Sequence, residues 1–319
     1  MKLILPILLL LLTTTPSLSL PSPHGPAAYV VGMTTSHGNT AILFQRASSP
    51  YASDRVFAMA SARILDDSRF FRVIRNDSQP DDPGFVAQWG IPGAPALTAA
   101  WLNDLLPNED PIPNPARRSN SRGTVALGAE YNADKTATCC RSIEMYVNYA
   151  DNSRLDPLGF TPFGTVLALP QHIDRIDSPE ATQWASDLVT RALEQGDAFR
   201  PDPQEIERGM QPLDELYAGY GEDISWQAMY DDGNAYLDVD RPLLSKLNTF
   251  FIMADSLPPP PPAPSPHTYM APQERIASIL TLTAFSLAAL AAISWAAVSY
   301  IRARNSYDLP RSLDGVPLV

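Results

Sequence analysis

Cysteine is nearly absent from this sequence of 319 residues, which contains only Cys139 and Cys140, side by side. A disulfide framework needs several spaced cysteines, so the class of small disulfide-rich proteins is excluded. Neighbouring cysteines rarely bridge because the ring that they would close is strained. We therefore expect free thiols or a rare vicinal disulfide. No further ligand lies at a spacing typical of zinc sites, so we expect no metal there.

Motifs of several common enzyme classes are also missing. The sequence has no H-E-x-x-H, no G-x-x-x-x-G-K-[ST] and no G-x-S-x-G. These absences argue against a zinc protease, a P-loop enzyme and an α/β-hydrolase. The four histidines lie in unrelated contexts. We expect no cofactor and no metal, and a hydrolase would need another design.

Positive charge is scarce, since 23 Lys and Arg residues stand against 35 Asp and Glu residues, for a net charge of -12. Such a chain repels phosphate backbones and anionic lipid headgroups, and it has no Lys/Arg-rich block to overcome this locally. Nucleic acid is therefore not expected as a partner. Hydrophobic residues make up 45% of the sequence and charged residues 18%. This balance is typical of a packed domain rather than of a disordered chain.

Two apolar segments flank the part of the chain that can fold. Residues 1–20 combine a basic start, a leucine-rich run and small residues, as signal peptides do. Residues 276–301 carry no charged side chain, and as a helix they would be about 39 Å long, enough for a tilted transmembrane span. More arginines follow this segment than precede it, which predicts a single-pass type I membrane protein with a cytosolic tail over 302–319.

The expected domain covers residues 27–253 and faces the lumen or the cell exterior. It is followed by a proline-rich stretch, 257–272, which predicts an extended linker to the membrane. Asn76 begins the only N-x-[ST] sequence, in a polar stretch that we expect to be an exposed loop and to be glycosylated. The endoplasmic reticulum or another membrane of the secretory pathway is the expected location.

Short apolar or alternating runs between turn-forming residues predict a mainly β domain. These runs cover residues 28–31, 40–44, 69–74, 85–89, 124–127, 145–149 and 165–169. The pattern indicates an antiparallel barrel or sandwich. Helical periodicity is clear in two stretches, 54–65 and 181–193, and we expect both helices to pack against the sheet.

The two runs around residues 72 and 88 carry the most informative side chains. Period-2 alternation places Arg72 on one face of its strand and Phe71 and Val73 on the other. An arginine can therefore stand outside a barrel that is packed from within. On the next strand, Val86 and Gln88 share a face. Taken alone, an arginine in a strand is usually a solvated surface residue.

The segments around these strands, taken in order, resemble the cyclophilin-type peptidyl-prolyl cis-trans isomerases, above all a divergent, bacterial-like branch of that family. The resemblance rests on residues 53–57, 65–74, 85–96, 119–125, 151–156, 159–164, 216–222 and 233–237. It runs from about residue 29 to about residue 252, with an insertion near 181–210. It implies a closed antiparallel eight-stranded barrel capped by two helices, in addition to the transmembrane helix.

The resemblance also implies the chemistry. Arg72 matches the arginine that donates an N–H to the prolyl nitrogen, and Gln88 matches the glutamine that orients the arginine and binds substrate backbone. Rotation about an X-Pro bond is slow because resonance gives the C–N bond double-bond character. A donor at the prolyl nitrogen favours the twisted, pyramidal form. The family's substrate-binding positions fall on Phe85, Val86, Glu144, Tyr146, Leu155 and Phe160.

Three departures from the family pattern lie close to these positions. Glu144 stands where the family has a second glutamine, and residues 129–136 replace the loop Asn-Ala-Gly-Pro-Asn-Thr of the substrate groove. Arg154 stands in place of the tryptophan on which cyclosporin binding depends, which predicts weak binding of this drug. The expected function is an isomerase that assists the folding of X-Pro-containing polypeptides. The alternative is a non-catalytic cyclophilin-like module that binds Pro-containing peptides.

Overall fold

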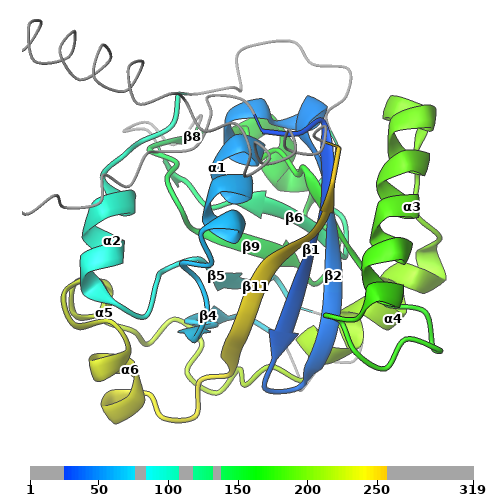
Figure 1. The fold of residues 1–319 in the computed structure, drawn as a ribbon. Coiled ribbons are helices and arrows are strands. Elements are labelled where there is room, and N and C mark those ends of the chain that lie inside the picture. Colours follow the sequence, from blue (N-terminus) through cyan, green and yellow to red (C-terminus); the bar gives the residue numbers. More distant parts are fainter. Residues whose placement is uncertain (1–24, 76–83, 108–117, 132–137, 257–319) are drawn as a thin grey trace, which may run out of the picture. The chain divides into compact units, whose positions relative to one another are not determined.

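The computed structural model describes residues 25–75, 84–107, 118–131 and 138–256 (Figure 1). The chain divides into Met1–Pro258 and Pro259–Val319, and all described residues belong to the first part. Asn76 and the segments predicted as signal peptide, linker, transmembrane helix and cytosolic tail lie outside the described residues. Within the described ranges, no helix has the length and apolar character that a membrane span requires.

A nine-stranded antiparallel sheet is the centre of the domain. Its strands follow the order β3-β11-β1-β2-β10-β6-β9-β5-β4. Their bounds are β1 (Ala28–Thr35), β2 (Gly38–Gln45), β3 (Ser68–Arg69), β4 (Arg72–Val73), β5 (Val86–Trp89), β6 (Thr124–Leu127), β9 (Met145–Asn148), β10 (Gly164–Leu167) and β11 (Lys246–Asp255). A separate pair consists of β7 (Glu130–Tyr131) and β8 (Thr138–Cys139). The prediction of a mainly antiparallel β domain is confirmed.

The two ends of the large sheet are consecutive in the chain. β3 pairs with β11, and β4 pairs with β5. Between them, the backbone N–H of Phe70 donates to the carbonyl of Ser245 at 3.0 Å, and that of Phe71 donates to the carbonyl of Gln88 at 3.1 Å. The sheet therefore curls. The expected closed barrel of eight strands is replaced by a curled sheet of nine, because one predicted strand, 69–74, is divided between two partners.

The main core lies on one side of this sheet. Tyr29, Val31 and Met33 of β1 belong to it, while Ala28 and Val30, which alternate with them, pack in a second cluster with α3 (Pro179–Gln195). Figure 1 shows α3 beside β2, away from α1 (Pro50–Ser61). The alternation of β1 thus supplies apolar side chains to both faces, because each face is covered by a helix.

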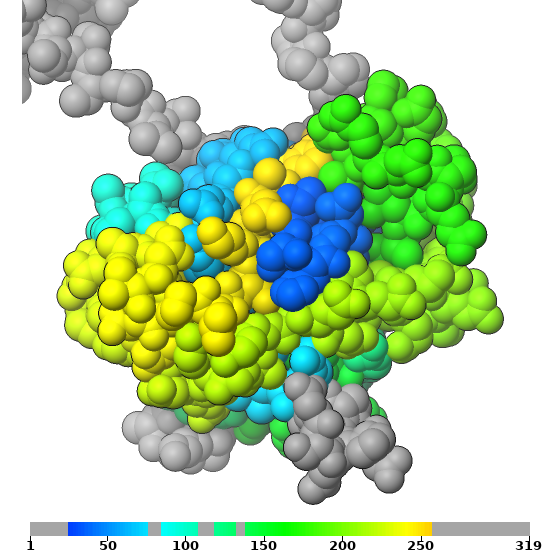
Figure 2. Space-filling view, turned by 90° about the horizontal axis from the view of Figure 1, so that it is seen from below, coloured from blue at the N-terminus to red at the C-terminus, as the bar shows by residue number. Residues whose placement is uncertain are grey.

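Two predicted helices are confirmed, since 54–65 corresponds to α1 and 181–193 to α3. Further helices are present: α2 (Pro95–Leu102), α4 (Pro203–Asp214), α5 (Trp226–Asp232) and α6 (Asn234–Asp240). Short 3-10 helices lie at Arg46–Ser48, Ser153–Leu158 and Gly196–Ala198. The expectation of only two capping helices is therefore wrong. Figure 2 shows the C-terminal part of the domain, in lime to yellow, spread over one face around the blue N-terminal strands.

Candidate functional site

Arg72 and Gln88 lie opposite each other in the ladder of β4 and β5. Phe71 and Val73 are buried in the main core, whereas the side chain of Arg72 points away from it and is 20% exposed. Nη1 of Arg72 donates a hydrogen bond to Oε1 of Gln88 at 2.7 Å. The structure thus brings together the two residues that were predicted to be catalytic.

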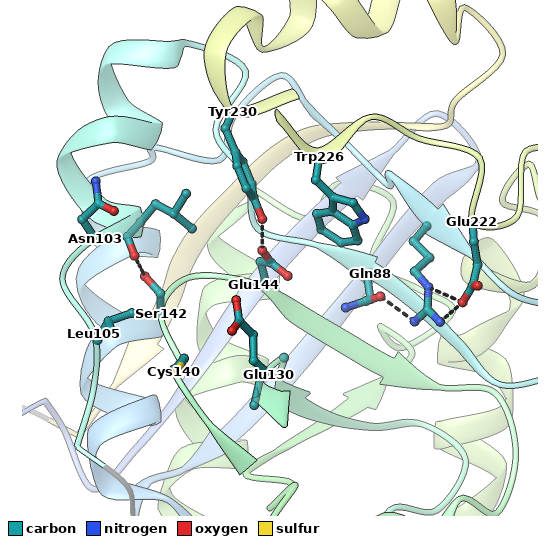
Figure 3. Close-up of a pocket in the computed structure, with 14 residues that line it drawn as sticks. Gln88, Asn103, Leu105, Glu130, Cys140, Ser142, Glu144, Glu222, Trp226 and Tyr230 are labelled. Atoms are coloured by element: carbon teal, nitrogen blue, oxygen red, sulfur yellow. Dashed lines mark hydrogen bonds and ion pairs between the residues drawn. The ribbon is translucent and has the colours of Figure 1, made fainter. Parts of the chain in front are cut away.

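Glu222 is a second partner of Arg72, and strand periodicity gave no indication of it. Nε of Arg72 donates to Oε1 of Glu222 at 3.0 Å, and Nη2 donates to the same oxygen (Figure 3). Glu222 precedes α5 and is 150 residues away in the sequence. This carboxylate holds the plane of the guanidinium and offsets its charge. The Glu222 side chain is 68% exposed, so solvent weakens the ion pair.

An apolar cluster lies beside this pair, on the face of the sheet opposite the main core. Its buried members are Val86, Ala126, Tyr146, Leu155 and Phe160, and Phe85 packs against them. All five apolar and aromatic residues that were predicted to bind substrate belong to this group. The rings of Tyr146 and Phe160 meet edge to face at 6.1 Å. The guanidinium of Arg72 lies 5.6 Å from the centre of the Phe85 ring, which links the pair to the cluster.

Asn120 forms hydrogen bonds with two residues of the apolar cluster, Tyr146 and Phe160. It is fully buried, and its Oδ1 accepts a hydrogen bond from the Tyr146 hydroxyl at 2.7 Å. Its Nδ2 donates to Oδ1 of Asp156 at 2.8 Å and to the carbonyl of Phe160 at 2.6 Å. Burial raises the pKa of Tyr146 well above its usual value, so the hydroxyl stays protonated as a donor. Asn120 lies within the segment 119–125 that carries the family resemblance, but no role was predicted for it.

Glu144 lies outside the apolar cluster and contacts a helix instead. Its Oε1 accepts a hydrogen bond from the Tyr230 hydroxyl of α5 at 2.8 Å. Burial raises the pKa of the Glu144 carboxyl and outweighs the hydrogen bond from Tyr230; the nearby Glu130 adds to the rise, whereas the charge of Arg72 opposes it. Of the predicted substrate-binding residues, Glu144 is the one that the structure places in a different environment.

That environment is a cavity of about 870 Å³ next to Arg72 and Gln88. Glu144 and Glu222 line it together with Trp226 and Tyr230 of α5. In Figure 3, Tyr230 and Trp226 reach down toward Glu144 and Gln88. Arg72 therefore stands between an apolar cluster and a cavity with acidic and aromatic walls.

Arg154 also lies at the apolar cluster, as its matched position implied. Its guanidinium is 4.7 Å from the centre of the Phe85 ring, and Nη1 donates to Oδ1 of Asn152 at 2.5 Å. The Phe85 ring is thus approached by two guanidinium groups. A guanidinium therefore covers the Phe85 ring at the position from which weak cyclosporin binding was predicted.

Residues 30–192 match a family model described as cyclophilin type peptidyl-prolyl cis-trans isomerase/CLD. This match covers slightly more than half of the chain and includes Arg72, Gln88 and the whole apolar cluster. No curated protein matches the chain.

Some solved structures are similar to the domain. One is a cyclophilin type peptidyl-prolyl cis-trans isomerase of Cryptosporidium parvum, 14% identical, which aligns with 72% of this chain and 99% of its own, at a TM-score of 0.35. The same protein in the presence of the dipeptide Ala-Pro is 16% identical over 56% of this chain and 89% of its own, at 0.30. The Mimivirus cyclophilin is 14% identical over 46% of this chain and 75% of its own, at 0.35.

Proposed function

This chain belongs to the cyclophilin-type peptidyl-prolyl cis-trans isomerase family, and we propose that Arg72 and Gln88 form its catalytic pair. The observation that carries the proposal is the 2.7 Å hydrogen bond between them, at the edge of an apolar cluster of matching positions. The proposed substrates are X-Pro-containing polypeptides, whose folding the enzyme assists.

The reaction needs a donor at one nitrogen atom. The barrier to rotation about a peptide bond is roughly 18–20 kcal/mol, because the nitrogen lone pair is delocalised into the carbonyl. As the bond twists, the lone pair localises on the prolyl nitrogen and accepts a hydrogen bond that the planar ground state accepts poorly. A guanidinium N–H held there binds the transition state more strongly than the substrate and so accelerates rotation.

Arg72 has donors left for this task. A guanidinium carries five N–H groups, and the bonds of Arg72 to Gln88 and Glu222 use one N–H on each of Nε, Nη1 and Nη2. Each of the two terminal nitrogens therefore keeps a second N–H for a substrate. Gln88 and Glu222 fix the plane of the group, so this orientation need not be created during the reaction.

The apolar cluster is suited to hold the proline ring while the preceding residue turns. Val86, Tyr146, Leu155 and Phe160 are buried side chains on the same face of the sheet as Gln88. A ring held against them loses its contact with water, which contributes about 25 cal/mol for each Å² of apolar surface removed. The cluster holds the ring and Arg72 donates to the nitrogen of that ring, so both act on the prolyl side of the peptide bond while the preceding residue turns.

The second candidate function is binding of Pro-containing peptides without catalysis. The ion pair between Arg72 and Glu222 favours it, since a carboxylate that offsets the guanidinium weakens donation to a neutral nitrogen. Glu144, in place of the family's glutamine, adds a second acidic residue to the cavity that Glu222 lines. The two functions differ in whether the unmodified protein accelerates isomerisation.

A prolyl-isomerisation assay on the purified full chain, with Arg72→Ala and Arg72→Lys, tests the proposal. We expect activity in the unmodified protein and a loss of about a hundredfold in kcat/KM for Arg72→Ala, roughly 3 kcal/mol. Lysine should restore little, because it lacks the planar fork that Gln88 holds. Arg175→Ala is the matched control, since Arg175 is an exposed arginine paired with Asp177.

Two results decide against the proposal. An unmodified protein without measurable activity would favour the binding module. An active protein whose kcat/KM is unchanged in Arg72→Ala would show that Arg72 is not catalytic. Circular dichroism melts of each variant distinguish loss of catalysis from loss of folding.

We further propose that the domain belongs to the divergent, bacterial-like branch and works on the lumenal or extracellular side of a secretory-pathway membrane. The support comes from the sequence: a signal peptide over 1–20, a span over 276–301, and segments 216–222 and 233–237 that resemble the branch's C-terminal extension. Glycosylation at Asn76 is part of this proposal. Protection of the domain from added protease in sealed microsomes is the expected result, and its degradation there would refute the topology.

A further inference from the structure

The short ladder of β7 and β8 places a carboxylate opposite a thiol. Its register pairs Glu130 with Cys139 and Tyr131 with Thr138. Directly opposite residues of an antiparallel pair point to the same face, with Cβ atoms about 4.5–5.5 Å apart. The side chains of Glu130 and Cys139 therefore extend side by side.

Cys140 turns back toward the same place. In an extended strand it would point away from Cys139, because side chains alternate between the two faces. Its φ of 61°, however, is left-handed, a conformation that non-glycine residues seldom adopt. As a result, a carboxylate oxygen of Glu130 and the Sγ atoms of Cys139 and Cys140 all lie within 4.8 Å of one another.

We propose that Glu130, Cys139 and Cys140 form a binding site for a thiophilic divalent cation of the Zn²⁺ class. The two free thiols and the carboxylate supply three ligands, and a fourth position remains open to solvent, since Glu130 and Cys140 are exposed. Three protein ligands with one open position are common among zinc sites in proteins.

The dimensions of the cluster fit this ion. A Zn–S distance of about 2.3 Å corresponds to an S···S edge of about 3.8 Å in a tetrahedron. The ligand atoms lie within 4.8 Å of each other, so small side-chain rotations bring them to bonding distance. Two thiolates select Zn²⁺ and the related Cd²⁺ over Mg²⁺ and Ca²⁺, which prefer oxygen ligands.

The charges of the cluster also favour a cation. A carboxylate and two thiolates within 4.8 Å of one another would repel unless a positive charge lies among them. A bound divalent cation supplies that charge and stabilises both thiolates.

The site lies on the wall of the cavity beside Arg72. Glu130 and Cys140 line this cavity together with Gln88 and Glu144 (Figure 3). The proposed metal site is nevertheless separate from the proposed catalytic pair, because neither Arg72 nor Gln88 supplies a ligand. Its test therefore does not depend on isomerase activity.

Titration of the reduced, metal-free full chain with Co²⁺ under anaerobic conditions tests the site. We expect a thiolate-to-cobalt charge-transfer band and the visible d–d bands of tetrahedral cobalt, both saturating at one equivalent and lost when Zn²⁺ is added. Cys139→Ser and Cys140→Ser should each weaken or abolish the charge-transfer band. Glu130→Gln should weaken Co²⁺ binding by about tenfold or more, since even indirect partners of a metal contribute this much.

Glu194→Gln is the matched control, because Glu194 is an exposed glutamate of α3 outside the cluster, and it should bind Co²⁺ as the unmodified chain does. The proposal fails if no charge-transfer band forms, or if the band is unchanged in both serine variants. It also fails if Glu130→Gln binds as tightly as the control, because the carboxylate is then not a ligand. Far-ultraviolet circular dichroism of each variant verifies that the fold is retained.

Discussion

Replacement of Glu222 by glutamine separates the two effects of this side chain on Arg72. The carboxylate accepts hydrogen bonds from Nε and Nη2 of Arg72 and also offsets the positive charge of the guanidinium. Glutamine keeps an oxygen that can accept these bonds but removes the charge. We expect kcat/KM for isomerisation to rise, because a guanidinium with less compensation donates more strongly to the prolyl nitrogen.

The expected size of the rise in kcat/KM follows from the exposure of the Glu222 side chain to solvent. Because the Glu222 side chain is 68% exposed, the interaction has the strength of a surface ion pair, about 1 kcal/mol or less. If the full amount appears in the transition state, kcat/KM rises by about fivefold. The free energy of unfolding should fall by no more than a similar amount. Glu222→Ala, which also removes the hydrogen bonds, should be less active than Glu222→Gln.

The assay compares kcat/KM of the unmodified protein, Glu222→Gln and Glu222→Ala at low and high salt. Screening already weakens the ion pair at high ionic strength, so the advantage of Glu222→Gln should shrink as salt is added. Glu207→Gln is the matched control, because Glu207 forms an ion pair of similar exposure with Arg122, outside the site.

An equal loss of activity in Glu222→Gln and Glu222→Ala would refute this reasoning. It would mean that the charge of Glu222 is needed to position Arg72 and that compensation of the guanidinium does not limit the rate. A rise that persists unchanged at high salt would refute the electrostatic cause.

Three more predictions follow from the environment of the site. The raised pKa of Glu144 means that its charged form is disfavoured in the folded state, so the free energy of unfolding falls as pH rises above the usual range of glutamate. Glu144→Gln can still form a hydrogen bond with Tyr230 and should remove this fall. Urea denaturation of both proteins at about pH 4 and about pH 8 measures it. Asn120→Ala should lower the free energy of unfolding by about 1–3 kcal/mol, because it leaves the buried Tyr146 hydroxyl without its acceptor, and thermal melts would show it. Cyclosporin should bind weakly in calorimetry and more tightly to Arg154→Trp, which supplies an indole N–H and a flat apolar face.

Local patterns in the sequence predicted how the side chains at the centre of the candidate site are oriented. Alternation correctly predicted that Phe71 and Val73 are buried while Arg72 points the other way, because a strand with one face against a core has no other register that buries its apolar side chains. The family resemblance then grouped Phe85 with residues far along the chain, and all of them except Glu144 belong to the apolar cluster.

The partners on the acidic side of the site could not be predicted in this way. The local sequence pattern does not show that Glu222 bonds to Arg72 or that Tyr230 bonds to Glu144. These contacts depend on how α4, α5 and α6 pack against the sheet. The segment 216–222 was noted for its resemblance to a C-terminal extension, and it ends on Glu222. That resemblance was the one available signal, and it carried no information about contacts.

Strand β11 was missed for a similar reason. Its ten residues show a mixed burial pattern rather than regular alternation, because the strand meets both the main core and the cluster under α3. The expectation of no metal site at Cys139 rested on linear spacing, which does not reveal that Glu130 lies opposite Cys139 across a ladder.

The pairing of the first and last strands determines when this domain can fold. β1 pairs with β11 from Tyr29 opposite Asp255 to Thr35 opposite Leu247, and β3 pairs with the start of β11. Contacts between residues so distant in sequence form late, because a long loop must close first. During synthesis, β3 and the edge of β1 that does not face β2 stay unpaired until the residues of β11 have left the ribosome. Until then, these two open edges are the part of the sheet most prone to pair with a strand of another chain.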